Sequence, residues 1–450
     1  MDEPGGWLRR FALDRPEARA WALYDWANSG FWAVVITAVF PQYYAEVASE
    51  LSSEAAEFRF TLATTVALLL IAILAPFLGT IADFRASKKA FFSAFVTLGI
   101  VATACMFFVH PGGWLLALML FGAANIGASG SVIFYDAFLP HVARKCEMDR
   151  LSSSGFALGY LGGGLLLALN LAWILKPAWF GLPSGEGLSS AEATLPVRLA
   201  LLSVAVWWSV FTIPMWLRVK EPPRVIEEDE SPDQSLMRVS IQRVSETFRE
   251  LRRYRQAFLL LLAFLIYNDG ILTIIRMSSL YAASIGLNRE VVVGTFLGVQ
   301  FVGIPCALVF GQLAGRFGPK RMIMVGVLVY CAIPVLAYFM VSELHFVLLG
   351  LCVAAVQGGT QALSRSLFAS MIPRHKSGEF FAFFAVGEKF AGVMGQAGLT
   401  VLVGLTGSLQ ISILCVIVFF VVGAALLRRV DVEEGRREAQ AAEAGLVPAA

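Results

Sequence analysis

Six charged residues lie well inside long apolar stretches of this 450-residue sequence: Asp25, Asp269, Arg276, Arg365, Glu388 and Lys389. An ionisable side chain inside a membrane-spanning helix costs about 2.5–3.5 kcal/mol on insertion scales, so each should face protein or water. A guanidinium can bind a carboxylate through two parallel hydrogen bonds. A buried carboxyl can receive an ammonium group or carry a proton. The same charges could instead pair with one another as helix locks or gates, and the sequence leaves both interpretations open.

Helical spacing places further polar residues near these charges. Asn28 follows Tyr24 by one turn, and Gln357 and Gln361 share a face with Arg365. These patterns predict a central site for a zwitterion, with these candidate substrate-binding residues: Tyr24, Asn28, Asn125, Tyr267, Asn268, Asp269, Arg276, Gln357, Gln361 and Glu388.

A second set of charged residues is expected to couple or gate the protein: Asp25, Asp83, Arg85, Asp136, Arg316, Arg365 and Lys389. Asp25 follows Arg19 closely, so a gate there is as plausible as substrate contact. Asp269 and Arg276 are about 10 Å apart along one helix, too far for a direct pair. Glu388 and Lys389 point about 100° apart and should meet different partners.

The composition predicts the environment of these residues. The chain is 58% hydrophobic and 15% charged, with mean hydropathy +0.71, against about 45–50% and about 25% in soluble domains. Six cysteines are too few for a disulfide scaffold, and a net charge of +2 argues against a nucleic-acid binder. A polytopic membrane protein remains.

Twelve apolar runs are long enough for membrane helices, which need about 20 residues each. They lie near 20–45, 60–82, 90–109, 113–138, 152–175, 197–217, 257–283, 291–314, 321–341, 346–371, 380–404 and 409–427. The runs lack the alternation of β-barrel strands. The first run carries Tyr24, Asp25, Trp26 and Asn28 and lacks a cleavage site, so we expect a span rather than a signal peptide.

The loops indicate the orientation. Seventeen Lys and Arg residues fall in loops and ends on one side of the predicted spans and four on the other. Short cytoplasmic loops carry the excess of positive charge. Both termini are therefore expected in the cytoplasm, with the chain in the plasma (inner) membrane.

A polar linker divides the chain into two six-helix halves. We expect an N-terminal bundle at 1–218, a cytoplasmic linker at 219–255, a C-terminal bundle at 256–430 and a cytoplasmic tail at 431–450. The linker carries apolar residues on one face of a basic amphipathic helix: Met237, Ile241, Val244, Phe248 and Leu251. This helix could lie in the membrane interface or pack as a solvated linker under the protein.

The two halves carry related loops. Residues 79–89 read Gly-Thr-Ile-Ala-Asp-Phe-Arg-Ala-Ser-Lys-Lys, and 311–321 read Gly-Gln-Leu-Ala-Gly-Arg-Phe-Gly-Pro-Lys-Arg, at an offset of 232. Pro140-His141 matches Pro373-Arg374 at an offset of 233. The first loop resembles the loop signature of major facilitator transporters: Gly79, Asp83 and Lys88 match it, and 84, 86 and 87 depart. Parallel six-helix repeats are typical of that superfamily.

Three further blocks resemble its vacuole-effluxer branch, the relatives of a fungal autophagy-related permease. They are 23–31 (Leu-Tyr-Asp-Trp-Ala-Asn-Ser-Gly-Phe) followed by Phe40-Pro41, 135–140 (Tyr-Asp-Ala-Phe-Leu-Pro) and 152–160 (Ser-Ser-Ser-Gly-Phe-Ala-Leu-Gly-Tyr). The resemblance implies an all-α, twelve-helix major facilitator fold and release of amino acids. It also implies that Asp83 lies near a helix end and basic residues such as Arg85, holding the halves shut when the protein opens outward. The alternative is that Arg85, Lys88 and Lys89 only mark topology, which we favour for the lysines.

The functional expectation is a secondary transporter that moves a small polar or zwitterionic solute by alternating access, with protons as a candidate coupling ion. The alternative is a lipid-moving or transport-dead receptor protein on the same scaffold. No nucleotide-binding loop and no H-E-x-x-H motif occurs, so neither an ATP-driven pump nor an enzyme is expected. We expect no cofactor, metal or nucleic acid, membrane lipid as the surroundings, and a monomer.

Overall fold

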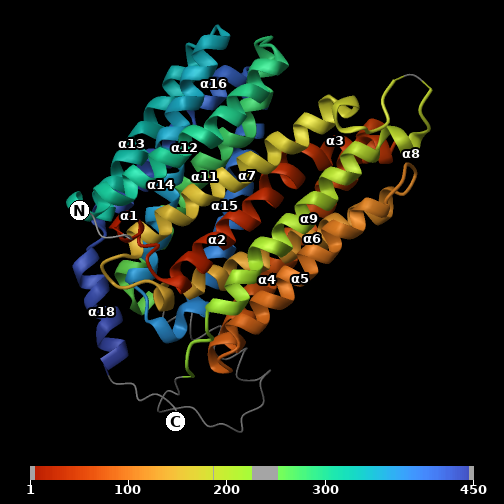
Figure 1. Cartoon of the computed structure of the whole chain (residues 1–450). Helices are drawn as coiled ribbons and strands as arrows, with labels where there is room; N and C mark the ends of the chain where they lie inside the picture. The colour runs from red at the N-terminus through yellow and green to blue at the C-terminus, as the bar shows by residue number, and fades with distance from the viewer. Residues whose placement is uncertain (1–5, 186, 225–251, 445–450) are drawn as a thin grey trace.

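A computed structural model describes residues 6–185, 187–224 and 252–444. The amphipathic helix predicted at 237–251 lies outside the described residues. The remaining segments form helices and their connecting loops (Figure 1).

The N-terminal half contains six long helical segments. The first is continuous through α2 (Pro16–Gly30), the π-helical turn η1 (Phe31–Val39) and α3 (Phe40–Val47). The others are α4 (Ser53–Phe84), α5 (Lys88–Cys105), α6 (Trp114–Val142), α7 (Met148–Leu175) and α9 (Leu195–Arg218). Short elements connect them: α1 (Gly6–Arg10), η2 (Met106–Phe108), η3 (Pro177–Phe180) and α8 (Ser190–Ala193).

The C-terminal half repeats this arrangement with α11 (Arg255–Ser284), α12 (Arg289–Phe317), α13 (Pro319–Tyr338), α14 (Glu343–Ser370), η4 (Arg374–Lys376) and α15 (Ser377–Thr406). Its last span is α16 (Leu409–Leu414) with α17 (Ile417–Arg429), followed by α18 (Val432–Ala444). Among the described residues, ten helices are long and apolar enough to cross a membrane. The segment at 16–47 and α15 occupy the places of the first and eleventh predicted spans.

The first span changes its helical pitch midway. The N–H of Phe40 donates to the carbonyl of Val35, five residues earlier, at the end of the wide turn. Pro41 follows and has no N–H, so the regular helical pattern cannot continue unchanged across it. Wide turns of this kind are frequent at functional sites, and this one presents Trp32 to the other half.

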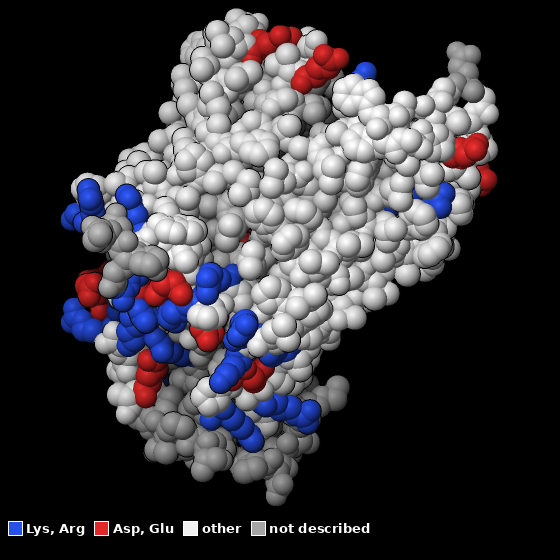
Figure 2. Space-filling model, viewed as in Figure 1, with Lys and Arg blue, Asp and Glu red and all other residues white. Residues whose placement is uncertain are grey.

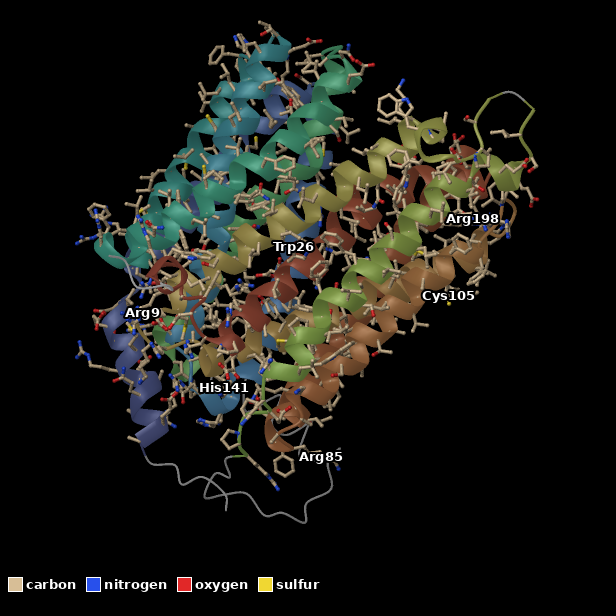
Figure 3. The ribbon with its side chains drawn as sticks, viewed as in Figure 1. Arg9, Trp26, Arg85, Cys105, His141 and Arg198 are labelled. Carbon is tan, nitrogen blue, oxygen red and sulfur yellow. The ribbon has the colours of Figure 1, made fainter. Side chains whose placement is uncertain are left out.

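One end of the molecule is strongly basic. We call it the basic end; it holds α1, the α4–α5 and α6–α7 loops and α18. Figure 2 shows Lys and Arg gathered there and sparse at the opposite, far end. Figure 3 places Arg9, Arg85 and His141 toward the basic end, Arg198 toward the far end and Trp26 between them.

The two halves lean apart toward the far end. In Figure 1, α12, α13 and α16 diverge from α3, α8 and α9 there, and Figure 2 shows a notch between the two lobes. Hydrogen bonds and ion pairs between the halves lie toward the basic end.

Candidate functional site

Arg365 on α14 joins the two halves through ion pairs. Its Nη1 donates to Asp136 Oδ1 at 3.0 Å, and its Nη2 donates to Asp25 Oδ2 at 3.1 Å. Asp25 lies on α2 and Asp136 on α6, so one guanidinium from the C-terminal half holds two helices of the N-terminal half. All three residues lie within about three turns of the basic ends of their helices.

Further contacts fix the orientation of this guanidinium. Nε of Arg365 donates to Ser152 Oγ at 2.9 Å, and Nη2 donates to the Ser152 carbonyl at 3.1 Å. Ser152 Oγ in turn donates to the Ala362 carbonyl at 2.7 Å. The rings of Trp21 and Phe156 lie 4.8 and 4.6 Å from the guanidinium carbon. Arg365 is only 5% exposed, and such a pair contributes specific geometry more than stability.

Gly155 on α7 makes room for this cluster. A Cβ there would collide with Asp25 Oδ2 and would lie 3.3 Å from Nη2 of Arg365. Gly159 packs in the same way against Ser29. Small residues allow membrane helices to approach closely, so these glycines bring α2 against α7 and set the position of Asp25.

Asp83 forms a second connection between the halves. Its Oδ1 accepts the Gly378 N–H at 3.2 Å, and its Oδ2 accepts the Glu379 N–H at 2.8 Å. These groups open α15, where the helix dipole favours a negative charge. A Cβ on Gly79 would lie 2.6 Å from the Gly378 carbonyl, so two glycines permit the close approach of α4 and α15.

Lys88, expected only to mark topology, forms the ion pair with Asp83 and is buried. Arg85, the expected basic neighbour of Asp83, is exposed. Lys88, three residues later in the chain, takes that place. Glu221 accepts the backbone N–H groups of Lys88 and Lys89 at 2.8 and 2.6 Å. Burial raises the pKa of the Glu221 carboxyl, opposed by these hydrogen bonds.

Three more polar contacts close the basic end. Ser366 Oγ donates to Asp149 Oδ1 at 2.5 Å, and His141 Nε2 lies 3.2 Å from Ser377 Oγ. Arg10 donates to the side chain of Gln312 at 2.9 Å. Each contact joins one half to the other.

Deeper in the C-terminal half, the predicted residues of α11 meet α14 and α15. Gln361 donates to Asn268 Oδ1 at 3.3 Å, and the Tyr267 hydroxyl lies 2.5 Å from Ser364 Oγ. Asp269 is buried, and its Oδ1 has no hydrogen-bond partner among the described residues. Its carboxylate would lie 2.8 Å from a Cβ on Gly395.

Two further charges of the predicted binding set, Arg276 and Glu388, and the predicted gating residue Lys389 are exposed or half-buried. Arg276 is exposed, and the carboxylates of Asp269 and Glu388 act electrostatically on it. Glu388 and Lys389 are half-buried. Lys389 Nζ lies 5.2 Å from the centre of the Trp32 ring, which is a cation–π contact between the halves.

Other predicted binding residues lie inside one half. The Tyr24 hydroxyl donates to Ser131 Oγ at 2.6 Å and accepts from Asn28 at 3.2 Å. Asn125 accepts from Ser129 at 3.3 Å. The side chains of Tyr24, Asn28 and Asn125 are buried. Gln357 is half-buried, and Arg316, which was predicted as a gating residue, is exposed.

Sequence reasoning missed several partners of the cluster. Ser152 was singled out only as part of a motif block, and Trp21 and Trp32 were not considered as contacts of charged residues. Three consecutive serines at 152–154, at the start of an apolar run, were the sequence feature that could have indicated polar contacts there.

Comparison with known proteins identifies the family. Residues 59–440 match the family model described as vacuole effluxer Atg22 like. The chain belongs to this family. An uncharacterized MFS-type transporter of Bacillus subtilis is 38% identical over 95% of this chain and 96% of its own length. The autophagy-related protein 22 of Yarrowia lipolytica is 28% identical over 65% of this chain, and the match spans about half (52%) of that relative.

Solved structures share the fold of this vacuole effluxer family member. The proton:xylose symporter XylE, bound to a bromodeoxyglucose, superposes with a TM-score of 0.71 at 14% identity, covering 95% of this chain and 98% of the other. The transporter FucP in its outward conformation also gives 0.71, at 16% identity, covering 93% and 100%. The all-α major facilitator fold predicted from the sequence is confirmed.

Proposed function

We propose that this chain is a secondary transporter that moves a small polar or zwitterionic solute between its two halves by alternating access. The observation that carries the proposal is Arg365, which ties α14 to α2 and α6 at the basic end while the halves diverge at the far end. We assign the basic end to the cytoplasm, because positive loops face that side. With that assignment, we propose that the protein is a monomer in the plasma membrane and that this arrangement is its outward-open state.

The solute we propose is an amino acid. Arg276 can bind a carboxylate in a fork, and Glu388 or Asp269 can receive an ammonium group. Asn268 and Gln361 are hydrogen-bonded to each other, and their amide groups can form hydrogen bonds with a solute instead. The description of the family as vacuole effluxers supports export of small solutes.

Opening the basic end requires Arg365 to leave Asp25 and Asp136, and Asp83 to leave α15. This is a rigid rearrangement between two packed states. The Arg365 cluster contains two carboxylates and one guanidinium, so it carries one surplus negative charge. A proton on Asp25 or Asp136 would neutralise that charge, and we propose this cluster as the proton-coupling site.

Reconstituted vesicles test the proposal. Purified protein is placed in liposomes with an imposed pH gradient, and entry of radiolabelled amino acids, xylose and nucleosides is followed. We expect accumulation of at least one amino acid, lost in Arg276→Gln. Arg437→Gln, which changes an exposed α18 residue of the same type, is the matched control. Folded protein that moves none of these solutes but moves fluorescent phospholipid would overturn the proposal.

A further inference from the structure

A cavity of about 600 Å³ lies at the basic end of the C-terminal half. The α12–α13 loop, the end of α17 and the start of α18 form its walls. Five basic residues line it: Lys320, Arg321, Arg428, Arg429 and Arg436. Asp431 and Glu433 are its acidic residues, so the net charge of the lining is +3.

Local bonds already engage both acids. Asp431 Oδ1 accepts the Glu434 N–H at 3.0 Å and so begins α18. Glu433 pairs with Arg436 at 3.3 Å. In contrast, Arg321, Arg428 and Arg429 are exposed and form no ion pair with a described residue. Three cationic side chains are therefore available to a ligand.

The walls of the cavity are fixed in place. Lys320 Nζ donates to the carbonyls of Arg428 and Val430 at 2.9 and 2.6 Å, which ties the α12–α13 loop to the end of α17. Gln256 accepts the Asp431 N–H at 2.8 Å and anchors the start of α18 to α11. A preformed, cationic hollow of this kind suits phosphate oxygens, which arginine binds through paired hydrogen bonds.

The apolar surroundings identify the source of the phosphate. Helix α13 begins at the cavity, α17 ends there, and the two helices pack against each other. Val325 and Leu328 on α13, and Val418 and Val421 on α17, are exposed on surfaces that would face lipid tails. Phe317 is exposed at the rim. A ligand with a phosphate head and acyl chains fits both surfaces at once.

We propose that this cavity binds the headgroup of an anionic phospholipid whose acyl chains lie along α13 and α17. Basic pockets at the ends of membrane helices are suited to such headgroups. The site does not depend on the proposed transport function, because it uses residues of one half only. It gives a role to Arg321 of the second-half loop motif, which the transport pathway leaves unused.

Lipid titration of purified protein tests this site. Thermal unfolding in detergent is followed while phosphatidylglycerol, phosphatidylethanolamine or sodium phosphate is added, since a ligand of the folded state raises the Tm by mass action. We expect phosphatidylglycerol to raise the Tm most. In R321Q/R428Q/R429Q its apparent Kd should increase by roughly a hundredfold, from about three lost surface charges.

The matched control is R9Q/K145Q/R437Q, which removes the same charge from exposed basic-end residues that do not line the cavity. We expect its Kd to change less than about tenfold, because screening limits distant charges. Native mass spectrometry should show retained phosphatidylglycerol on the wild-type chain and the control only. Equal losses in both variants, or equal stabilisation by sodium phosphate, would overturn the lipid site.

Discussion

The Arg365 side chain shows how one residue can hold a conformation. Its ion pairs to Asp25 and Asp136 and its bonds to Ser152 cross the interface between the halves. The sequence identified these charges as buried and as candidates for a gate, because charges in apolar runs are rare. It could not predict the pairing, since each helix fixes only which of its own residues share a face.

Removing the guanidinium should destabilise the protein strongly. R365Q leaves the buried Asp136 and the half-buried Asp25 without a cation, and loss of one partner from a buried pair costs about 3–5 kcal/mol. The variant R365Q/D25N/D136N, which removes all three charges, should recover most of that loss. Thermal unfolding in detergent measures both; a triple variant no more stable than R365Q would contradict this account.

Asp136 is expected to carry part of the proton coupling. D136N removes the surplus negative charge while Asp25 still pairs with Arg365. We expect the folded variant to exchange solute across the vesicle membrane in the absence of a pH gradient. Its solute accumulation in a pH gradient should be lower than that of wild type by at least about tenfold, equivalent to about 1.4 kcal/mol. Solute exchange and accumulation are compared on one preparation. Unchanged pH-driven accumulation would remove Asp136 from the coupling site.

At the scale of elements, glycines determine how closely helices approach. The sequence predicted the long helical segments well, because apolar runs and loop charges are local signals. Gly155 and Gly159 can be read from the sequence, but the side chains that pack against them cannot. The structure brings Asp25 against Gly155 and the start of α15 against Asp83.

Gly155→Ala should displace Asp25 and weaken the contact of α2 with α7. We expect a Tm lower than that of wild type and slower transport. Gly122→Ala on α6 is the control, because a Cβ there meets nothing within 4 Å. Alanine is favoured over glycine in helices by up to about 1 kcal/mol, so the control should be at least as stable as wild type. Equal effects of both substitutions would count against steric positioning.

Asp83→Asn should favour opening of the basic end. A charge at a helix N-terminus contributes about 0.3–1 kcal/mol, and up to about 2 kcal/mol when partly buried. We therefore expect a several-fold shift in the populations of the two states and a greater effect on turnover than on solute affinity. Distances between spin labels at the basic end report the shift, with Arg85→Gln as the control. A pure change in affinity would argue against a gate.

The whole molecule resembles a wedge that is closed at the basic end. Composition and repeated loops were enough to predict two related bundles. The conformational state was not predictable, because it depends on contacts between residues far apart in the chain, such as Ser366 and Asp149.

Covalent closure of the basic end should stop transport. In D149C/S366C, short side chains replace a hydrogen-bonded pair, which places the two sulfurs near bonding distance in this state. The exposed Cys146 is changed to Ser to avoid competing disulfides. Oxidation should abolish solute movement, and a reductant should restore it; each single-cysteine variant is the control. An oxidised, cross-linked protein that still transports would contradict alternating access.

The carboxylate of Glu221 also matters for the segment that joins the two bundles. It fastens the chain to the first backbone amides of α5, beside the lysine that holds Asp83. Glu221 thus holds the connector to the N-terminal bundle. Residues inserted after Arg224 should therefore leave the contact of Asp83 with α15 unchanged. A force on the connector, in contrast, would act first on Glu221 and would pass to the α4–α5 loop, next to the contact of Asp83 with α15.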